Sequence, residues 1–383
     1  MEYDFDKQVT RRHSGSYKWD SASGDDVLPL WVADMDFETA PAVIEALQRR
    51  VSHGVFGYEL VPDAYYEALT SWFERRHGWT ICCDDVICVP GVVPAISAII
   101  KALTRPGDGV IVQTPAYNCF FSSVRNNGCR LMENKLRRVD TEDGGFVSEI
   151  DFENLEALAA DPRTPVMILC NPHNPTGRVW TRAELERVAD ICRRHNVTVI
   201  SDEIHCELTM PGIEYVPYAT VDAGAVVCCS PSKAFNIAGL QIANIVVGDA
   251  DMRYHIDRAV NDNEVCDVNP MGVEALIAAY NDGEQWLDAL REYLHENYRC
   301  LRGFFRDNFP AMRVANLEAT YLAWIDISSL GMSSREVEKV LLERGKVWVN
   351  AGDMYGDDSY IRINMACPRT VLLEGLRRIF MTL

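Results

Sequence analysis

A series of short, uninterrupted apolar runs between residues 85 and 250 limits what this chain can fold into. The runs are too continuous for strands with one exposed face, so both faces of the sheet must be covered. Helical patterns such as 182–194 lie between some of them, which predicts a mostly parallel sheet with right-handed crossovers. The runs expected to form strands are 86–89, 109–112, 166–170, 197–200, 225–228 and 242–247.

The last third of the chain has a different pattern. A long helical stretch, 270–308, is followed by two short alternating runs, 321–325 and 360–363, and a final helical stretch, 370–383. This order predicts a smaller α+β domain, with a boundary near residue 280.

Charge and composition exclude several classes of protein. The 383 residues include 37 Lys and Arg against 56 Asp and Glu, a net charge of −19, which argues against binding to nucleic acid or an anionic membrane. No apolar run approaches the roughly 18 residues needed to span a bilayer, and the opening MEYDFDKQVTRR lacks a signal-like stretch. The 13 cysteines are dispersed, many within apolar runs. We therefore expect a soluble cytoplasmic protein.

Three of the predicted strands end in polar sequences. A polar turn, 171–177, follows the first of them, Asp202 follows the second, and Lys233, flanked by hydroxyl groups, follows the third. Taken singly, these features could be a loop, a helix cap and a surface lysine. Because the carboxyl ends of parallel strands meet at one edge of a sheet, their joint occurrence indicates a functional site.

Pyridoxal phosphate is a cofactor that would use all three sequences. It needs a lysine for a Schiff base, a carboxylate for the pyridine nitrogen and a polar side chain for the ring hydroxyl. Burial would lower the pKa of a lysine and make it a usable nucleophile or base.

The same motifs carry a family resemblance over nearly the whole chain. The sequence resembles the fold-type-I pyridoxal-phosphate enzymes of aminotransferase class I/II. The motifs are Asn174-Pro175-Thr176-Gly177, Asp202, Ser230-x-Ser232-Lys233 and Arg362-x-Asn364-x-Ala366. A closer resemblance is to the bacterial cystathionine β-lyases (C–S lyases) of the MalY/PatB type, through segments 18–20, 28–37, 56–58, 171–177, 202–205 and 320–324.

This resemblance implies the fold and the domain organisation. The fold class is α/β, the PLP-dependent transferase fold type I, with helices on both sides of a mostly parallel sheet in the large domain and a smaller α+β domain. Residues 50–280 would form the large cofactor-binding domain. Residues 1–49 and 281–383 together would form the small domain.

The resemblance also implies a role for each candidate residue. Lys233 corresponds to the Schiff-base lysine, Asp202 to the partner of the pyridine nitrogen, and Arg362 to the bidentate clamp for the substrate carboxylate. The remaining cofactor-binding candidates are Val92 and Val93 for the phosphate, Tyr117 for the ring face, Asn174 for the ring hydroxyl, His205, Ser230, Ser232, and Tyr58. Tyr58 resembles a tyrosine supplied by the neighbouring subunit, which implies a homodimer with shared active sites.

Two positions depart from the wider family. Many relatives have an arginine eight residues after the Schiff-base lysine, where this chain has Gln241, and a tyrosine three residues after the aspartate, where it has His205. These differences leave the full coordination of the phosphate open. Cys170 with His173, and His205 with Cys206, could outline a zinc site, but without a Cys-x-x-Cys pair we predict no metal.

The residues alone are compatible with more than one reaction. The resemblance favours β-elimination from L-cystathionine or a related S-substituted cysteine, giving a thiol, pyruvate and ammonia. Transamination by an enzyme of the same fold is an alternative, as is a regulator-binding protein that also has lyase activity. The preferred sulfur substrate stays undetermined.

Overall fold

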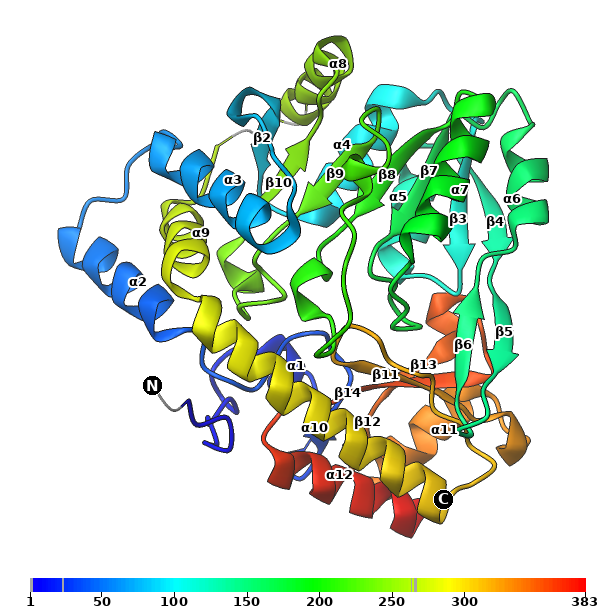
Figure 1. Ribbon diagram of the computed structural model, residues 1–383. Helices are drawn as coiled ribbons and strands as arrows, with labels where there is room; N and C mark the ends of the chain where they lie inside the picture. Colours follow the sequence, from blue (N-terminus) through cyan, green and yellow to red (C-terminus); the bar gives the residue numbers. More distant parts are fainter. Residues whose placement is uncertain (1–2, 23, 263, 265–266) are drawn as a thin grey trace.

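The computed structural model describes residues 3–22, 24–262, 264 and 267–383. Its central sheet has the strand order β2-β10-β9-β8-β7-β3-β4 (Figure 1). The strands are β2 (Val86–Val89), β3 (Gly109–Thr114), β4 (Arg130–Lys135), β7 (Val166–Cys170), β8 (Thr198–Asp202), β9 (Val226–Cys229) and β10 (Ala243–Val246). All pairs from β4 through β9 are parallel, whereas β10 runs antiparallel to both of its neighbours. The predicted mostly parallel α/β sheet is confirmed.

Helices cover both faces of this sheet, which explains the uninterrupted apolar runs. In β7, Val166 and Ile168 pack on one side with α4 (Val92–Leu103), α5 (Asn118–Asn126) and α8 (Ala250–Asn261). Met167 and Leu169 pack on the other side with α6 (Phe152–Ala159) and α7 (Arg182–Arg194). Successive side chains of a strand point to opposite faces, so a strand buried on both sides needs apolar residues at every position.

The long helical stretch predicted at 270–308 is two helices, α9 (Pro270–Asp282) and α10 (Glu284–Asn308). They meet at Gly283, where an added Cβ would lie 2.5 Å from both the Ala279 carbonyl oxygen and a ring carbon of Phe235. The break between the two helices therefore depends on a close approach of Phe235 to Gly283 that a side chain at this position would prevent. The helical periodicity of the sequence does not reveal this contact.

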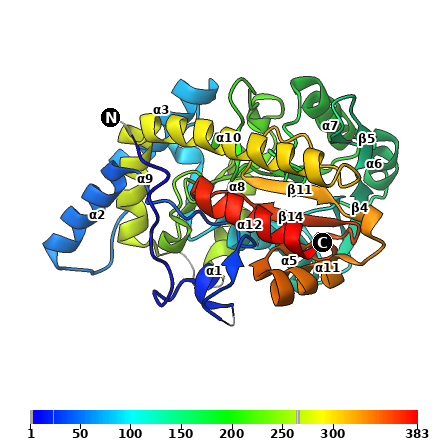
Figure 2. The same cartoon turned by 90° about the horizontal axis from the view of Figure 1, so that it is seen from below.

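The C-terminal part contains the small strands and the final helix that the sequence predicts. Strands β11 (Leu322–Asp326), β14 (Tyr360–Asn364) and β13 (Asn350–Ala351) form an antiparallel sheet. The last helix, α12 (Arg369–Thr382), packs beside α10 (Figure 2).

The N-terminal segment packs on this C-terminal part. Strand β1 (Leu28–Pro29) pairs in parallel with β12 (Val347–Trp348), although more than 300 residues separate them along the chain. The division into a large domain, 50–280, and a small domain, 1–49 with 281–383, stays a prediction. Helices α2 (Pro41–His53) and α3 (Asp63–His77) both contact α9.

The remaining α-helices and strands of the described chain are short. They are α1 (Tyr17–Asp20), α11 (Ser334–Val340) and the hairpin of β5 (Arg137–Asp140) with β6 (Phe146–Glu149). Among the residues described, none of the helices combines the length and the apolar character needed to cross a membrane. The MEYDFDKQVTRR opening includes Met1 and Glu2, which lie outside the described residues.

Candidate active site

A cavity of about 380 Å³ lies at the carboxyl ends of β7, β8 and β9. It brings together most of the residues predicted from sequence, although they come from five separate segments of the chain. The predicted residues in its wall are Val92, Val93, Tyr117, Asn174, Asp202, His205, Ser232 and Lys233. Gln241, at the position where many relatives have an arginine, also lines it.

Lys233 presents its amine to this cavity. Its Nζ donates a hydrogen bond to the Ala33 carbonyl oxygen, 2.8 Å away. Removal from bulk water lowers the pKa of Lys233, because burial disfavours the charged ammonium. The amine is therefore shifted toward the neutral form that can attack a carbonyl or accept a proton.

Asp202, the last residue of β8, is buried in the wall of the same cavity. Its Oδ1 accepts a hydrogen bond of 3.1 Å from the Ile204 N–H, and no ion pair with a cationic side chain of the described chain holds it. Burial raises the pKa of Asp202 to about 7. A cationic group in the cavity would reverse this shift, as expected for a carboxylate that binds a protonated ring nitrogen.

Arg362 lies next to the cavity and is 3% exposed. It donates to the Asn174 side-chain oxygen at 3.0 Å and to the Trp31 carbonyl oxygen at 3.2 Å, and its guanidinium lies over the Tyr355 ring. Within the described part of the chain it forms no ion pair, and its Nε has no hydrogen-bond partner. A buried guanidinium without a carboxylate partner is costly, so this arrangement is typical of a site for an anionic ligand.

His205 is also buried, and its ring packs edge-on against Tyr321. Burial, with the nearby positive charges of Lys233 and Arg362, lowers the pKa of His205 to about 3. The imidazole is therefore neutral at physiological pH. Its Nδ1 has no hydrogen-bond partner among the described residues, which leaves it available to a ligand.

The end of the cavity predicted to hold a phosphate is the start of α4. Val92 and Val93 are the first residues of this helix, whose N-terminal N–H groups and dipole favour an anion. Ser232 lines the cavity here, whereas the Ser230 hydroxyl donates to the Ile242 carbonyl oxygen at 2.6 Å. The hydroxyl hydrogen of Ser230 is thus already used, so its predicted role as a phosphate donor stays a prediction.

Tyr58 does not reach the cavity of its own chain. It lies in the loop between α2 and α3 and is 95% exposed. This placement does not test a role in a neighbouring subunit, so the assignment of Tyr58 also stays a prediction.

Sequence reasoning gave no role to the backbone of the segment before α2. The Ala33 carbonyl oxygen accepts hydrogen bonds from both Lys233 and the Tyr321 hydroxyl, and the Trp31 carbonyl oxygen accepts one from Arg362. Every residue has a backbone carbonyl, so residue types do not indicate which carbonyl groups accept hydrogen bonds in a site. The only indication for this segment was its resemblance at 28–37.

Comparisons with known proteins identify the family. The model of aminotransferase class I and II matches residues 25–379. The chain belongs to this family. The predicted resemblance is confirmed, and so is the fold-type-I architecture.

Its relatives include lyases. Cystathionine β-lyase PatB of Bacillus subtilis (strain 168) is 39% identical, with 98% of each chain covered. Protein MalY of Escherichia coli (strain K12) is 36% identical over 98% of this chain and 97% of that one. The crystal structure of cystalysin from Treponema denticola, which contains a pyridoxal 5′-phosphate cofactor, matches with a TM-score of 0.95 at 34% identity, covering 100% of this chain and 99% of that one.

The raised pKa of Asp202 predicts a measurable pH dependence of stability in the cofactor-free protein. The folded protein holds a proton on Asp202 up to about pH 7, whereas the unfolded chain loses it near pH 3.8. The lowered pKa of buried His205 makes the free energy of unfolding rise with pH over part of this window. Asp202 contributes an opposing fall of up to about 4 kcal/mol. Asp202→Asn should remove this fall, as measured by urea unfolding between pH 4 and 8.

A matched control is Asp190→Asn, which changes an exposed aspartate on α7. It should leave the pH dependence of unfolding as in the wild type. Parallel pH profiles for wild type and Asp202→Asn would contradict the assignment of a buried, proton-holding carboxyl.

Proposed function

We propose that this protein is a pyridoxal-phosphate-dependent C–S β-lyase. It cleaves L-cystathionine or a related S-substituted cysteine into a thiol, pyruvate and ammonia. The observation that carries the proposal is one cavity that presents the Lys233 amine and the buried Asp202 carboxyl to the same space. The names of the relatives, a cystathionine β-lyase and cystalysin among them, support cleavage of a carbon–sulfur bond.

The residues around the cavity fit the cofactor. Asp202 would hold the ring nitrogen, Asn174 the ring hydroxyl and Tyr117 the ring face, while Lys233 would bond to its aldehyde. The phosphate would lie at the N-terminus of α4. When bound, this cofactor supplies an electron-poor ring that stabilises negative charge on the α-carbon of an amino acid.

The side chains of this protein would then bind the substrate and move its protons. The Arg362 guanidinium would bind the substrate carboxylate, with its direction fixed by Asn174 and the Trp31 carbonyl. The Lys233 amine, shifted toward its neutral form, would take the α-proton at Nζ. A thiolate on the β-carbon is then expelled readily, because a thiol with a pKa of about 8.5 gives a modestly basic leaving group.

The test of this function is incubation of the cofactor-loaded protein with L-cystathionine, with thiol and pyruvate measured together. A lyase should release both in equal amounts without an added keto acid, whereas an aminotransferase would need a keto acid as amino acceptor. Lys233→Ala should abolish both products and the absorption band of the lysine-bound cofactor. Lys101→Ala, a change on the surface of α4, should leave them unchanged.

Arg362→Lys tests the proposed carboxylate clamp. It keeps the positive charge but loses the planar fork that binds a carboxylate through two parallel hydrogen bonds. We expect apparent substrate affinity to fall by roughly 1.5–3 kcal/mol, measured by steady-state kinetics, with little change in cofactor absorbance. Unaltered kinetics would exclude Arg362 from the substrate site.

We also propose that the protein is a cytoplasmic homodimer, with Tyr58 completing the active site of the neighbouring subunit. A run of exposed apolar residues at the end of α2 and in the following loop supports an interface: Val51, Val55, Phe56, Tyr58 and Leu60. Gln241 in the phosphate end of the cavity leaves room for another donor, and a phenol supplies one without a buried charge. Dispersed free cysteines favour a reducing compartment.

Subunit mixing tests the role of Tyr58. Lys233→Ala and Tyr58→Ala proteins should each be severely impaired alone. If Tyr58 acts across the interface, the mixed dimer contains one site with both residues intact, and lyase activity rises above that of either parent. No recovery after proven subunit exchange would contradict the assignment.

A further inference from the structure

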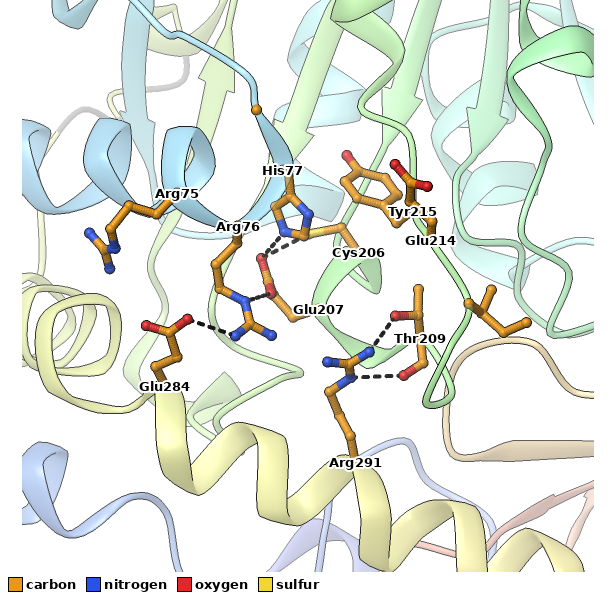
Figure 3. A pocket seen from close by; sticks show the side chains of 12 residues that line it. Arg75, Arg76, His77, Cys206, Glu207, Thr209, Glu214, Tyr215, Glu284 and Arg291 are labelled. Carbon is orange, nitrogen blue, oxygen red and sulfur yellow. Dashed lines mark hydrogen bonds and ion pairs between the residues drawn. The ribbon is translucent and has the colours of Figure 1, made fainter.

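A second cavity, of about 550 Å³, lies outside the candidate active site (Figure 3). It is bounded by the end of α3, the short turn η2 (Cys206–Leu208) and the start of α10. Cys206 and Glu207 line this cavity, whereas the preceding residue, His205, lines the active-site cavity. The two cavities are thus separated by a single turn of the chain.

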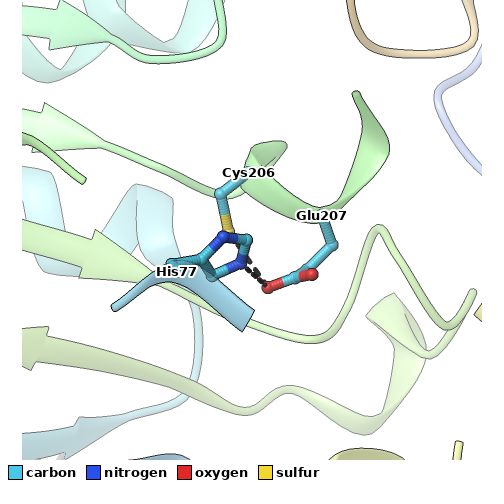
Figure 4. Close-up of side chains that lie close together, drawn as sticks. All are labelled: His77, Cys206 and Glu207. Carbon is cyan, nitrogen blue, oxygen red and sulfur yellow. Dashed lines mark hydrogen bonds and ion pairs between the residues drawn. The ribbon is translucent and has the colours of Figure 1, made fainter. Parts of the chain in front are cut away.

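Three side chains with metal-binding atoms converge in the wall of this second cavity (Figure 4). The ligand atoms of His77, Cys206 and Glu207 all lie within 4.8 Å of one another. His77 Nε2 is 2.7 Å from Glu207 Oε1, and the Cys206 thiol is 3.8 Å from the same oxygen. Imidazole, thiolate and carboxylate are the ligand types that Zn²⁺ accepts in proteins.

Glu207 has one carboxylate oxygen that is not fully used. The side chain is 3% exposed, and Oε1 accepts from the Trp72 indole N–H at 2.6 Å and faces His77. Oε2 has no hydrogen-bond partner among the described residues, although Arg76 Nε lies 3.4 Å away in an ion pair. The oxygen beside the thiol and the imidazole is Oε1, which a metal ion would share with the Trp72 N–H, while Oε2 stays beside Arg76.

Neighbouring groups would hold the ligands in place. The Trp72 indole fixes the Glu207 carboxylate, and the Tyr215 ring packs edge-on against the His77 ring with 4.9 Å between ring centroids. Such outer contacts orient metal ligands and raise metal affinity.

Arg76 is the positive charge that competes for Glu207. Its guanidinium also pairs with Glu284 at 3.0 Å and with Asp288 at 2.9 Å. It therefore stays paired when a metal ion takes over the Glu207 carboxylate, and no uncompensated buried charge results.

We propose that His77, Cys206 and Glu207 form a site for a divalent, thiol-binding metal ion such as Zn²⁺, with the fourth coordination position open to the second cavity. Binding displaces the proton on the Cys206 sulfur, which is released to solvent. His77 lies 130 residues from Glu207 along the chain, so residue spacing does not bring these three side chains together. From the sequence, Cys206 is considered only beside His205, and no metal site is predicted.

Such a site would link two elements of the fold. The metal would join the last residue of α3 to the turn that directly follows His205. A ligand that binds only the folded state raises its stability by RT ln(1 + L/Kd), where L is the free ligand concentration. Zn²⁺ should therefore raise the unfolding temperature of the cofactor-loaded enzyme.

The test uses the cofactor-loaded enzyme, first dialysed against a chelator and then titrated with Zn²⁺ by equilibrium dialysis. We expect one Zn²⁺ per chain and a higher unfolding temperature. Cys206→Ser and His77→Gln should each weaken binding by at least about 10- to 100-fold, the loss seen when merely outer contacts of a metal site are removed. Co²⁺ should give a thiolate absorption band that is absent from Cys206→Ser.

Two control variants distinguish this site from other histidines and thiols. His195→Gln removes another histidine at a helix end that pairs with a glutamate, Glu156, and should bind Zn²⁺ like the wild type. The double variant of the exposed thiols, Cys82→Ser with Cys83→Ser, should also retain the site. Absence of binding in the wild type would overturn the proposal, as would undiminished binding by folded Cys206→Ser and His77→Gln, or loss only with Cys82 and Cys83.

Discussion

The segment from Trp31 to Met35 belongs to no helix or strand, so its carbonyl groups need hydrogen-bond donors from elsewhere. Side chains from distant parts of the chain supply them. Lys233 and Tyr321 donate to the Ala33 carbonyl, and Arg362 donates to that of Trp31. The same bonds that satisfy this backbone also fix the amine and the guanidinium of the candidate active site. The contacts that hold this segment are therefore also contacts that arrange the site.

The buried ionisable groups of the site are explained by the ligands that they would bind. Asp202 and Arg362 are each buried without an ion-pair partner among the described residues, which by itself disfavours folding. A cationic ring nitrogen beside the carboxyl and an anionic substrate group beside the guanidinium would remove both penalties. The free energy that burial of these two groups costs in the free protein would thus be recovered when the ligands bind.

Residues 202–207, which end β8 and begin the next turn, lie in three different environments. Asp202 and His205 face the active-site cavity, and Cys206 and Glu207 face the second cavity. Glu203 lines neither cavity and accepts hydrogen bonds from Ser201, Asn171 and the Tyr218 N–H, among others. These hydrogen bonds connect the end of β8 to the residue after β7 and to the loop that contains Tyr218. They therefore help to hold Asp202 and His205 in position. Residues 202–207 therefore contribute side chains to both cavities, and Glu203 anchors the segment between them.

The sequence alone determined the buried strands, because a strand covered on both faces needs apolar residues throughout. It also determined the polar residues at the strand ends, because a parallel sheet gathers its carboxyl ends at one edge. Lys233, Asp202 and Asn174 could be predicted as site residues from the sequence for that reason. Only the tertiary structure decided the antiparallel direction of β10, the break at Gly283, the role of the Ala33 carbonyl and the meeting of His77 with Cys206 and Glu207. These features depend on contacts between segments far apart in the chain, and local periodicity and residue type carry no information about which distant segments pack together.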